Sequence, residues 1–149
     1  MRLEKYPSKS NKIQNTFTFI SKGPKGHILK KVRYTKVKGF KNLYNLAFGD
    51  AKNNTGGIDD LVVTDNQDRE KVLATVAQTV IVFTNCYPKA NVFFRGSTNA
   101  RTRLYQMAIT KYFEELSENF DILGLTDYGW LPFEKNTTYI AFLINRKTN

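Results

Sequence analysis

Alternating apolar and polar residues predict a β-hairpin near the start of the chain. Residues Thr16–Phe19 alternate in this way, and a second alternating run extends from Ile28 to about Val37 after a basic, glycine-containing loop. Because strand side chains point alternately to opposite faces, Val32 and Tyr34 should share one face of the sheet. The other face should carry Lys31, Arg33 and Thr35. The pattern therefore predicts a sheet with one apolar and one basic face.

Two further apolar runs predict strands after the hairpin. The first is Tyr44–Phe48, and the second is Leu61–Val63, which follows a polar loop over residues 52–57. Antiparallel neighbours are the simplest connection between such short runs. We therefore expect the first four strands to form a meander.

Apolar residues recur at helical spacing in two segments. Capping residues at Thr64–Asn66 precede the first helix, whose apolar positions begin at Val72, and Pro88 forbids its continuation. The second helix should extend from about Thr98 to Asn119, because its apolar positions follow the i, i+3, i+4, i+7 pattern of an amphipathic helix. This stripe consists of Tyr105, Ala108, Ile109, Tyr112, Phe113 and Leu116.

The remaining apolar runs complete an α+β fold. Strands are expected at Val92–Phe94, Asp121–Gly124 and Thr138–Ile144, the last apolar enough to be central. The order β-β-β-β-α-β-α-β-β predicts a mainly antiparallel sheet with two helices packed on one face. The length of 149 residues fits one domain over residues 15–149. Residues 1–14 are basic, polar and aperiodic, so we expect a mobile or loosely docked arm there.

The sequence contains no segment typical of a membrane span or a secretion signal. Its longest unbroken apolar run, Val80–Phe83, is far below the roughly 18 to 20 residues that a transmembrane helix needs. Residues 1–7 contain no apolar core like that of a signal peptide. We therefore expect a cytoplasmic protein with no membrane partner.

The positive charge of the chain is concentrated in its first third. Residues 1–50 contain 12 Lys plus Arg and two acids, a net charge of +10, whereas residues 51–149 contain 11 of each sign. Such an excess favours a polyanionic partner, either nucleic acid or an acidic protein, but it is also typical of a solvated lysine-rich surface. The residues predicted to contact nucleic acid are Lys22, Lys25, Lys30, Lys31, Arg33 and Lys36.

The sequence around Arg95–Arg103 predicts a strand that turns into the beginning of a helix, and this arrangement suggests a second anion site. Gly96 permits a sharp turn, a following hydroxyl can cap the helix, and first-turn N–H groups beside guanidiniums suit an anion. On a helical wheel, Arg101 lies at the end of the apolar stripe and Arg103 points away from it. Arg101 should therefore bind either an anion or an internal carboxylate such as Asp59 or Asp60. The predicted anion-binding residues are Arg95, Ser97, Thr98, Arg101 and Arg103.

Several enzyme classes are excluded by the residue types present. His27, expected at the surface, is the only histidine, which excludes multi-histidine metal sites, and phosphate-loop and dinucleotide-binding glycine patterns are absent. Cys86 ends an apolar helical pattern, which favours a buried, inert thiol over a nucleophile. The carboxylates that could hold Mg²⁺ are Asp50, Asp59, Asp60 and Asp65, but turn and cap roles are the simpler interpretation. We expect neither a metal nor a cofactor.

Aromatic residues near the C-terminus allow two interpretations. The segment Asp127–Phe133 should be a loop or hairpin, and an exposed Trp130 could stack on a base or bind a partner. Core packing is favoured, because the neighbouring Ile122 and Leu123 need cover.

Five segments together resemble a family of small bacterial proteins with a domain of unknown function. They are Tyr44–Asp50, Ile58–Thr64, Lys71–Val76, Gly96–Tyr105 and Pro132–Lys135. The resemblance spans roughly residues 15–146. It implies a compact bacterial cytoplasmic domain and transfers no activity, cofactor or catalytic residue.

Three functional hypotheses follow from the sequence. The leading one is a binding module for a polyanion, with nucleic acid as the favoured partner, that uses the basic strand face and the arginine-rich turn. The second is a regulatory or interaction component with an acidic protein partner. The third is an enzyme acting on a phosphorylated small molecule, with Arg101 as the anion clamp. Binding is favoured over catalysis, because no residue set in the sequence specifies a reaction.

Overall fold

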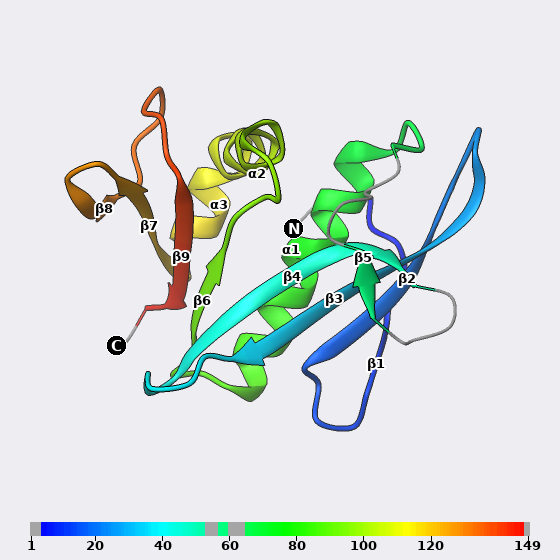
Figure 1. Ribbon diagram of the computed structural model, residues 1–149, viewed down its shortest axis with the longest axis horizontal. Coiled ribbons are helices and arrows are strands. Elements are labelled where there is room, and N and C mark those ends of the chain that lie inside the picture. The colour runs from blue at the N-terminus through cyan, green and yellow to red at the C-terminus, as the bar shows by residue number, and fades with distance from the viewer. Residues whose placement is uncertain (1–3, 53–56, 60–64, 148–149) are drawn as a thin grey trace. The chain divides into compact units, whose positions relative to one another are not determined.

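The computed structural model describes residues 4–52, 57–59 and 65–147 and has the expected α+β class (Figure 1). The described strands form a mostly antiparallel open sheet in the order β1-β2-β3-β4-β6-β9-β7-β8, with β5 paired to β4. The strands are β1 Lys9–Ser10, β2 Thr16–Gly23, β3 Gly26–Lys36, β4 Leu43–Ala51, β5 Ile58–Asp59, β6 Asn91–Phe94, β7 Phe120–Thr126, β8 Gly129–Pro132 and β9 Ala141–Arg146. The helices are α1 Arg69–Cys86, α2 Asn99–Lys111 and α3 Phe113–Ser117.

Tertiary contacts divide the chain into two compact units. The first unit comprises Met1–Thr35 and Leu46–Cys86, and the second comprises Lys36–Asn45 and Tyr87–Asn149. Strand β4 contributes residues 46–51 to the first unit and residues 43–45 to the second. None of the helices in the described part of the chain combines enough length with enough apolar character to cross a membrane.

The predicted hairpin is the centre of the first unit. Strands β2 and β3 pair antiparallel, with Phe17 opposite Val32 and Ile20 opposite Leu29. Val32 and Tyr34 are buried as the alternation predicts, and the Tyr34 ring stacks on Phe83 of α1 with centroids 4.1 Å apart. Helix α1 therefore covers the apolar face of this hairpin, which leaves the basic strand face on the opposite side.

The polar segment before the hairpin makes specific contacts with the first unit. Tyr6 is 8% exposed, its backbone N–H donates to Thr75 Oγ1 at 2.9 Å, and its ring stacks on Phe19. Residues 9–10 form β1, which pairs with β2. One aromatic side chain and two strand residues make these contacts. Such a small number of contact residues leaves no periodic pattern in the sequence, so the docking could not be predicted from it.

Two local predictions near α1 need correction or fall outside the structure. Cys86 is exposed at the helix C-terminus, where its thiol lies 3.1 Å from Gln14 Oε1, so the prediction of a buried thiol is wrong. The physical reason is that the buried face of α1 ends at Phe83 and Thr84, before Cys86. The predicted strand Leu61–Val63 and the side chain of Asp60 lie outside the described residues.

Strands β2, β3 and β4 are sheet neighbours in the order that the predicted meander requires, and the second unit adds a parallel strand pair that was not predicted. Residues 43–45 of β4 pair in parallel with β6, with Tyr44 opposite Val92. Strand β9 then lies between β6 and β7 and is antiparallel to both, which makes it the central strand that its apolar sequence predicts. The expected long second helix is interrupted at Tyr112, whose φ of −109° and ψ of 17° separate α2 from α3.

The segment predicted as a loop or hairpin contains strand β8 of the second unit. Strand β8 pairs antiparallel with β7, and Trp130 lies opposite Leu125. Trp130 is 39% exposed and contacts Phe93 edge-to-face, with ring centroids 6.0 Å apart. The preferred core position is therefore wrong: an edge strand leaves one side of the indole ring without cover.

Candidate functional site

The face of the β2–β3 hairpin opposite α1 carries basic side chains beside hydroxyl and aliphatic ones. Arg33 lies opposite Thr16, and Lys31 lies opposite Thr18, which also faces Lys9 of β1. The next pair, Ile20 and Leu29, is 44% and 48% exposed. We call this surface the hairpin face and define it by Lys9, Thr16, Thr18, Ile20, Lys22, Leu29, Lys31 and Arg33.

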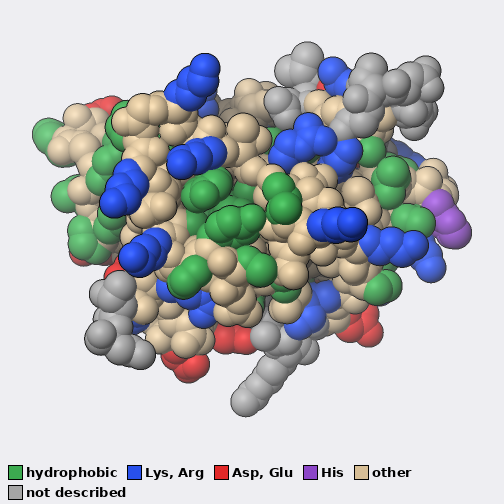
Figure 2. All heavy atoms as spheres, turned by 90° about the horizontal axis from the view of Figure 1, so that it is seen from below, with side chains coloured by type: hydrophobic (Ala, Val, Ile, Leu, Met, Phe, Trp, Pro, Cys, Tyr) green, Lys and Arg blue, Asp and Glu red, His purple; other side chains and the backbone are tan. Residues whose placement is uncertain are grey.

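The hairpin loop continues the positive charge beyond the strands. Lys22 near the end of β2 and Lys25 in the loop are exposed, and Figure 2 shows Lys and Arg side chains beside the histidine, which is the exposed His27 near the start of β3. No Asp or Glu occurs in the sequence between Glu4 and Asp50. The charged residues of the loop and of the hairpin face are therefore all positive.

Lys30 does not belong to this surface. Its side chain is 1% exposed on the covered side of β3, and its Nζ donates to Asp50 Oδ1 at 2.5 Å. The alternation that places Val32 and Tyr34 inside also places Lys30 inside, so the sequence contained the signal against a surface role. Lys30 is therefore removed from the predicted nucleic-acid contacts. Lys36 is exposed at the end of β3, in the second unit.

A buried polar network holds the hairpin loop against the start of α1. The carboxylate of Asp68 accepts hydrogen bonds from the hydroxyls of Tyr6 and Ser21, each at 2.6 Å. Burial raises the pKa of the Tyr6 hydroxyl, and its hydrogen bond to Asp68 adds to the increase. Asn66, which is 1% exposed, accepts from the backbone N–H of Lys25 at 2.7 Å and donates to the carbonyl of Gly26 at 2.9 Å. The position of the basic loop is therefore set by internal hydrogen bonds.

The arginine-rich turn of the second unit is closed by its own hydroxyl groups. Thr98 caps α2, because its side chain accepts from the backbone N–H of Arg101 at 3.2 Å. Buried Thr102 accepts from the N–H of Gly96 at 3.0 Å. A Cβ on Gly96 would lie 2.5 Å from both Arg101 Cβ and Thr102 N, so only glycine allows this approach. The predicted turn and cap are confirmed, and they use part of the donor capacity that an anion would need.

The arginines of this turn are separated as the helical wheel predicts. Arg101 is half-buried and donates from Nη1 to Ser97 Oγ at 2.6 Å, whereas Arg95 and Arg103 are exposed. Anion binding at Arg95, Ser97, Thr98, Arg101 and Arg103 stays a prediction.

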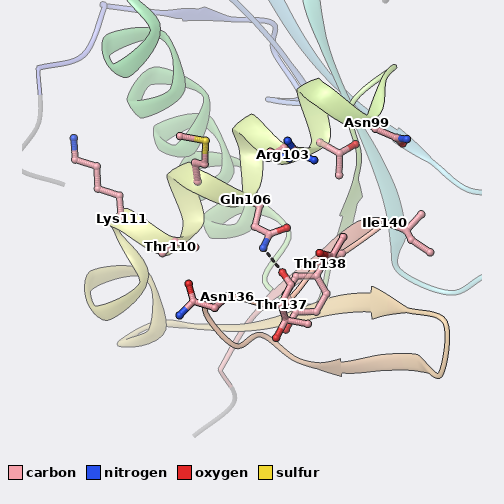
Figure 3. A pocket seen from close by; sticks show the side chains of 12 residues that line it. Asn99, Arg103, Gln106, Thr110, Lys111, Asn136, Thr137, Thr138 and Ile140 are labelled. Atoms are coloured by element: carbon pink, nitrogen blue, oxygen red, sulfur yellow. Dashed lines mark hydrogen bonds between the residues drawn. The ribbon is translucent and has the colours of Figure 1, made fainter.

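A groove lies between α2 and the segment that leads into β9 (Figure 3). Its volume is about 800 Å³, and seven α2 residues face Asn136–Ile140 across it. Figure 3 shows Gln106 reaching across the groove floor, where its amide donates to the carbonyl of Thr137. Arg103 and Lys111 line the groove, and no Asp or Glu does so. Sequence reasoning missed this groove because its two walls are about thirty residues apart in the chain.

The carboxylates considered for Mg²⁺ do not form a metal cluster in the described part of the chain. Asp50 lies opposite Asp59 in the β4–β5 pair, but Asp50 is the partner of Lys30. Asp65 forms a turn with its carboxylate accepting from the N–H of Gln67 at 2.9 Å, which is the predicted turn role.

The fold and these two surfaces place the molecule in the class of small α+β proteins, with a basic strand face and a groove lined by cations. The chain belongs to a family of unknown function, DUF6934, whose family model matches residues 2–147. Comparison with curated proteins and with solved structures gave no match.

Proposed function

We propose that this protein is a cytoplasmic module that binds the phosphate backbone of nucleic acid through the hairpin face. The observation that carries the proposal is the row of basic side chains opposite the α1-covered side of the hairpin, in a segment without an acid. Lysine and arginine next to phosphate release counterions, which is the main source of affinity in non-specific binding.

The spacing of the cations suits a chain of phosphates. Lys31 and Arg33 are two residues apart on β3, which separates them by about 6 to 7 Å along the strand. Lys9 is on β1, two strands away from Lys31 across Thr18, at about 10 Å in the perpendicular direction. Thr16 and Thr18 place hydroxyl donors between these cations, and hydroxyl groups are common phosphate ligands.

The same face argues against reading of base sequence. Its strand positions carry threonine, isoleucine, leucine, cations and, opposite Lys22, the imidazole of His27, and none of them carries Phe, Tyr or Trp. Bases stack on aromatic rings in proteins that grip single strands, and this face lacks the large rings that do so. We therefore propose backbone binding with little sequence preference.

The test is fluorescence anisotropy with labelled single-stranded DNA, duplex DNA and RNA in a salt titration. The charge-reversal variant Lys22→Glu, Lys25→Glu, Lys31→Glu should bind at least about tenfold more weakly at low salt. Its slope of log affinity against log salt should be shallower by about 0.7 to 0.9 for each phosphate group that the variant no longer neutralises.

A matched control has the same change of net charge elsewhere. Lys89→Glu, Lys135→Glu, Lys147→Glu replaces three exposed lysines of the second unit, none of which belongs to the hairpin face. This control should keep most of the affinity and the full salt slope. Equal losses of affinity in both triple variants, or no binding of any of the three nucleic acids at low salt, would refute the proposal.

A further inference from the structure

We propose that the groove between α2 and Asn136–Ile140 binds an extended acidic peptide segment of a partner protein. The segment has an acidic residue, any residue, an apolar residue, any residue and an acidic residue in succession. This site is in the second unit and is separate from the hairpin face, so the proposal goes beyond nucleic-acid binding.

The spacing of one row of α2 side chains specifies the peptide pattern. Arg103, Met107 and Lys111 follow one another at intervals of four residues and line the groove. Four helical residues advance by about 6 Å, and two residues of an extended chain advance by about 6.4 to 6.8 Å. Alternate side chains of an extended peptide can therefore meet the three α2 side chains in turn.

The chemistry of the row gives each peptide position its residue type. Arg103 and Lys111 are exposed cations at the two ends, and an acidic lining is absent from the groove. Met107, between them, is 57% exposed, and Ile140 on the opposite wall is 47% exposed. A carboxylate at each end and an apolar side chain in the middle complement this order of charge and apolar surface.

The rest of the groove suits a peptide backbone. Asn99 and Asn136 line the groove at its opposite ends (Figure 3). Each amide side chain has donors and an acceptor, which matches the alternating N–H and C=O groups of an extended chain.

The groove wall is preformed, which reduces the entropy lost on binding. Gln106 donates to the carbonyl of Thr137 across the floor. Tyr139 is 6% exposed, its ring stacks on Phe133 with centroids 5.2 Å apart, and its hydroxyl accepts from the N–H of Glu134 at 2.7 Å. The segment opposite α2 is therefore held in place without a ligand.

A nucleic acid strand fits the groove less well than a peptide does. Tyr139 is the only aromatic residue among those that line the groove, and its ring is buried. Base stacking on aromatic rings is a main source of single-strand affinity, so this surface lacks it. The exposed Met107 and Ile140 instead offer the apolar contact that a peptide side chain uses.

The first experiment selects peptides from a random twelve-residue library displayed on phage, with the intact protein as bait. Selected peptides are then synthesised and their affinities measured by fluorescence anisotropy. Enrichment of the five-residue acidic and apolar pattern is expected. Recovery of no binding peptide, or of peptides without the paired acidic positions, would overturn the proposal.

The second experiment uses substitutions in α2 to test whether a selected peptide binds in the groove. Arg103→Glu, Lys111→Glu should weaken its binding by at least about tenfold, because two attractions become repulsions. The neutral double variant Arg103→Gln, Lys111→Gln should weaken peptide binding by a smaller factor. This variant replaces the charge-reversal variant if charge reversal disturbs the fold of α2. Met107→Ala should weaken peptide binding without changing its salt dependence.

Two controls separate this proposal from nucleic-acid binding. Lys89→Glu, Lys147→Glu changes the net charge equally outside the groove and should leave the peptide affinity within about twofold. The hairpin variant Lys22→Glu, Lys25→Glu, Lys31→Glu should likewise keep peptide binding even if it no longer binds nucleic acid. Unchanged peptide binding in the groove variants refutes the site. Binding of a single-stranded oligonucleotide that disappears in the groove variants, without peptide binding, refutes the ligand class.

Discussion

Both units contain packed aromatic rings, but buried polar side chains are concentrated in the first unit. Of the described buried polar or charged residues, the first unit contains Ser21, Lys30, Asn66, Thr75, Thr79 and Thr84, whereas the second contains Thr102. Among the buried rings of the second unit, Phe94, Phe133, Tyr139 and Phe142 pack against one another, with ring centroids 5.2 to 6.2 Å apart.

The difference means that the two interiors resist different changes. A buried charge or hydroxyl needs its partner, so removing one partner leaves an unsatisfied group in a medium of low polarity. Close-packed phenylalanine rings have no such partners to lose, but close-packed rings leave little room for added atoms. The first unit should be sensitive to the removal of partners and the second to changes of volume.

The largest effect is expected from the buried ion pair. Asp50→Ala leaves the ammonium group of Lys30 buried with its carboxylate removed, which should lower the free energy of unfolding by about 3 to 5 kcal/mol. The double variant Lys30→Met, Asp50→Leu should recover most of this loss, because neither buried charge remains. Urea unfolding of wild type and both variants measures the two changes. A loss below about 1 kcal/mol for Asp50→Ala would show that the pair is not a buried partnership.

Volume should matter more in the second unit. A Cβ at Gly124 would collide with the ring of Tyr139, so Gly124→Ala should destabilise the protein by about 1 to 3 kcal/mol. Tyr139→Leu in the same chain should remove the collision and reduce the additional cost of the alanine. Urea unfolding of the double-mutant cycle tests this coupling, and strictly additive losses would contradict it.

An alkaline titration tests the polar interior of the first unit. Burial raises the pKa of the Tyr34 hydroxyl above its ordinary 10.0, while its hydrogen bond to Thr79 acts in the opposite direction. The unfolded chain therefore loses this proton before the folded one does, so the stabilisation is present below pH 10 and is lost as the pH rises above it. Between pH 10 and 11, the free energy of unfolding of the wild type should fall by up to about 1.4 kcal/mol more than that of Tyr34→Phe. Parallel pH profiles of the two proteins would contradict the assignment.

The smallest effect is expected at the second tyrosine with a buried hydroxyl. Tyr112 Oη is buried without a hydrogen-bond partner among the described residues, unlike Tyr34 Oη, which lies 2.8 Å from Thr79 Oγ1. Tyr112→Phe should change the free energy of unfolding by less than about 1 kcal/mol, in the stabilising direction, because it removes an unsatisfied group. Thermal unfolding compares the two phenylalanine variants. A larger loss of stability for Tyr112→Phe than for Tyr34→Phe would reverse the contrast between the units.

The local structure was predictable where the pattern involves neighbours in the chain. The hairpin, the cap at Thr98 and the opposite directions of Arg101 and Arg103 depend on periodicity and on turn chemistry. The sequence favoured buried positions for Cys86 and Trp130, and both are exposed, since exposure depends on which element covers a position. The parallel pairing of β4 with β6 was missed for the same reason, because a local pattern does not choose between strand partners.

By itself, the sequence determined the basic first third of the chain, the two faces of β3 and the position of the Gly96 turn. These depend on charge, on alternation and on backbone freedom, which are properties of adjacent residues. Only the tertiary structure decided that Lys30 is paired with Asp50 and that α2 faces Asn136–Ile140 across a groove. Both arrangements join residues distant in the chain, and the packing that brings them together is a property of the folded chain as a whole.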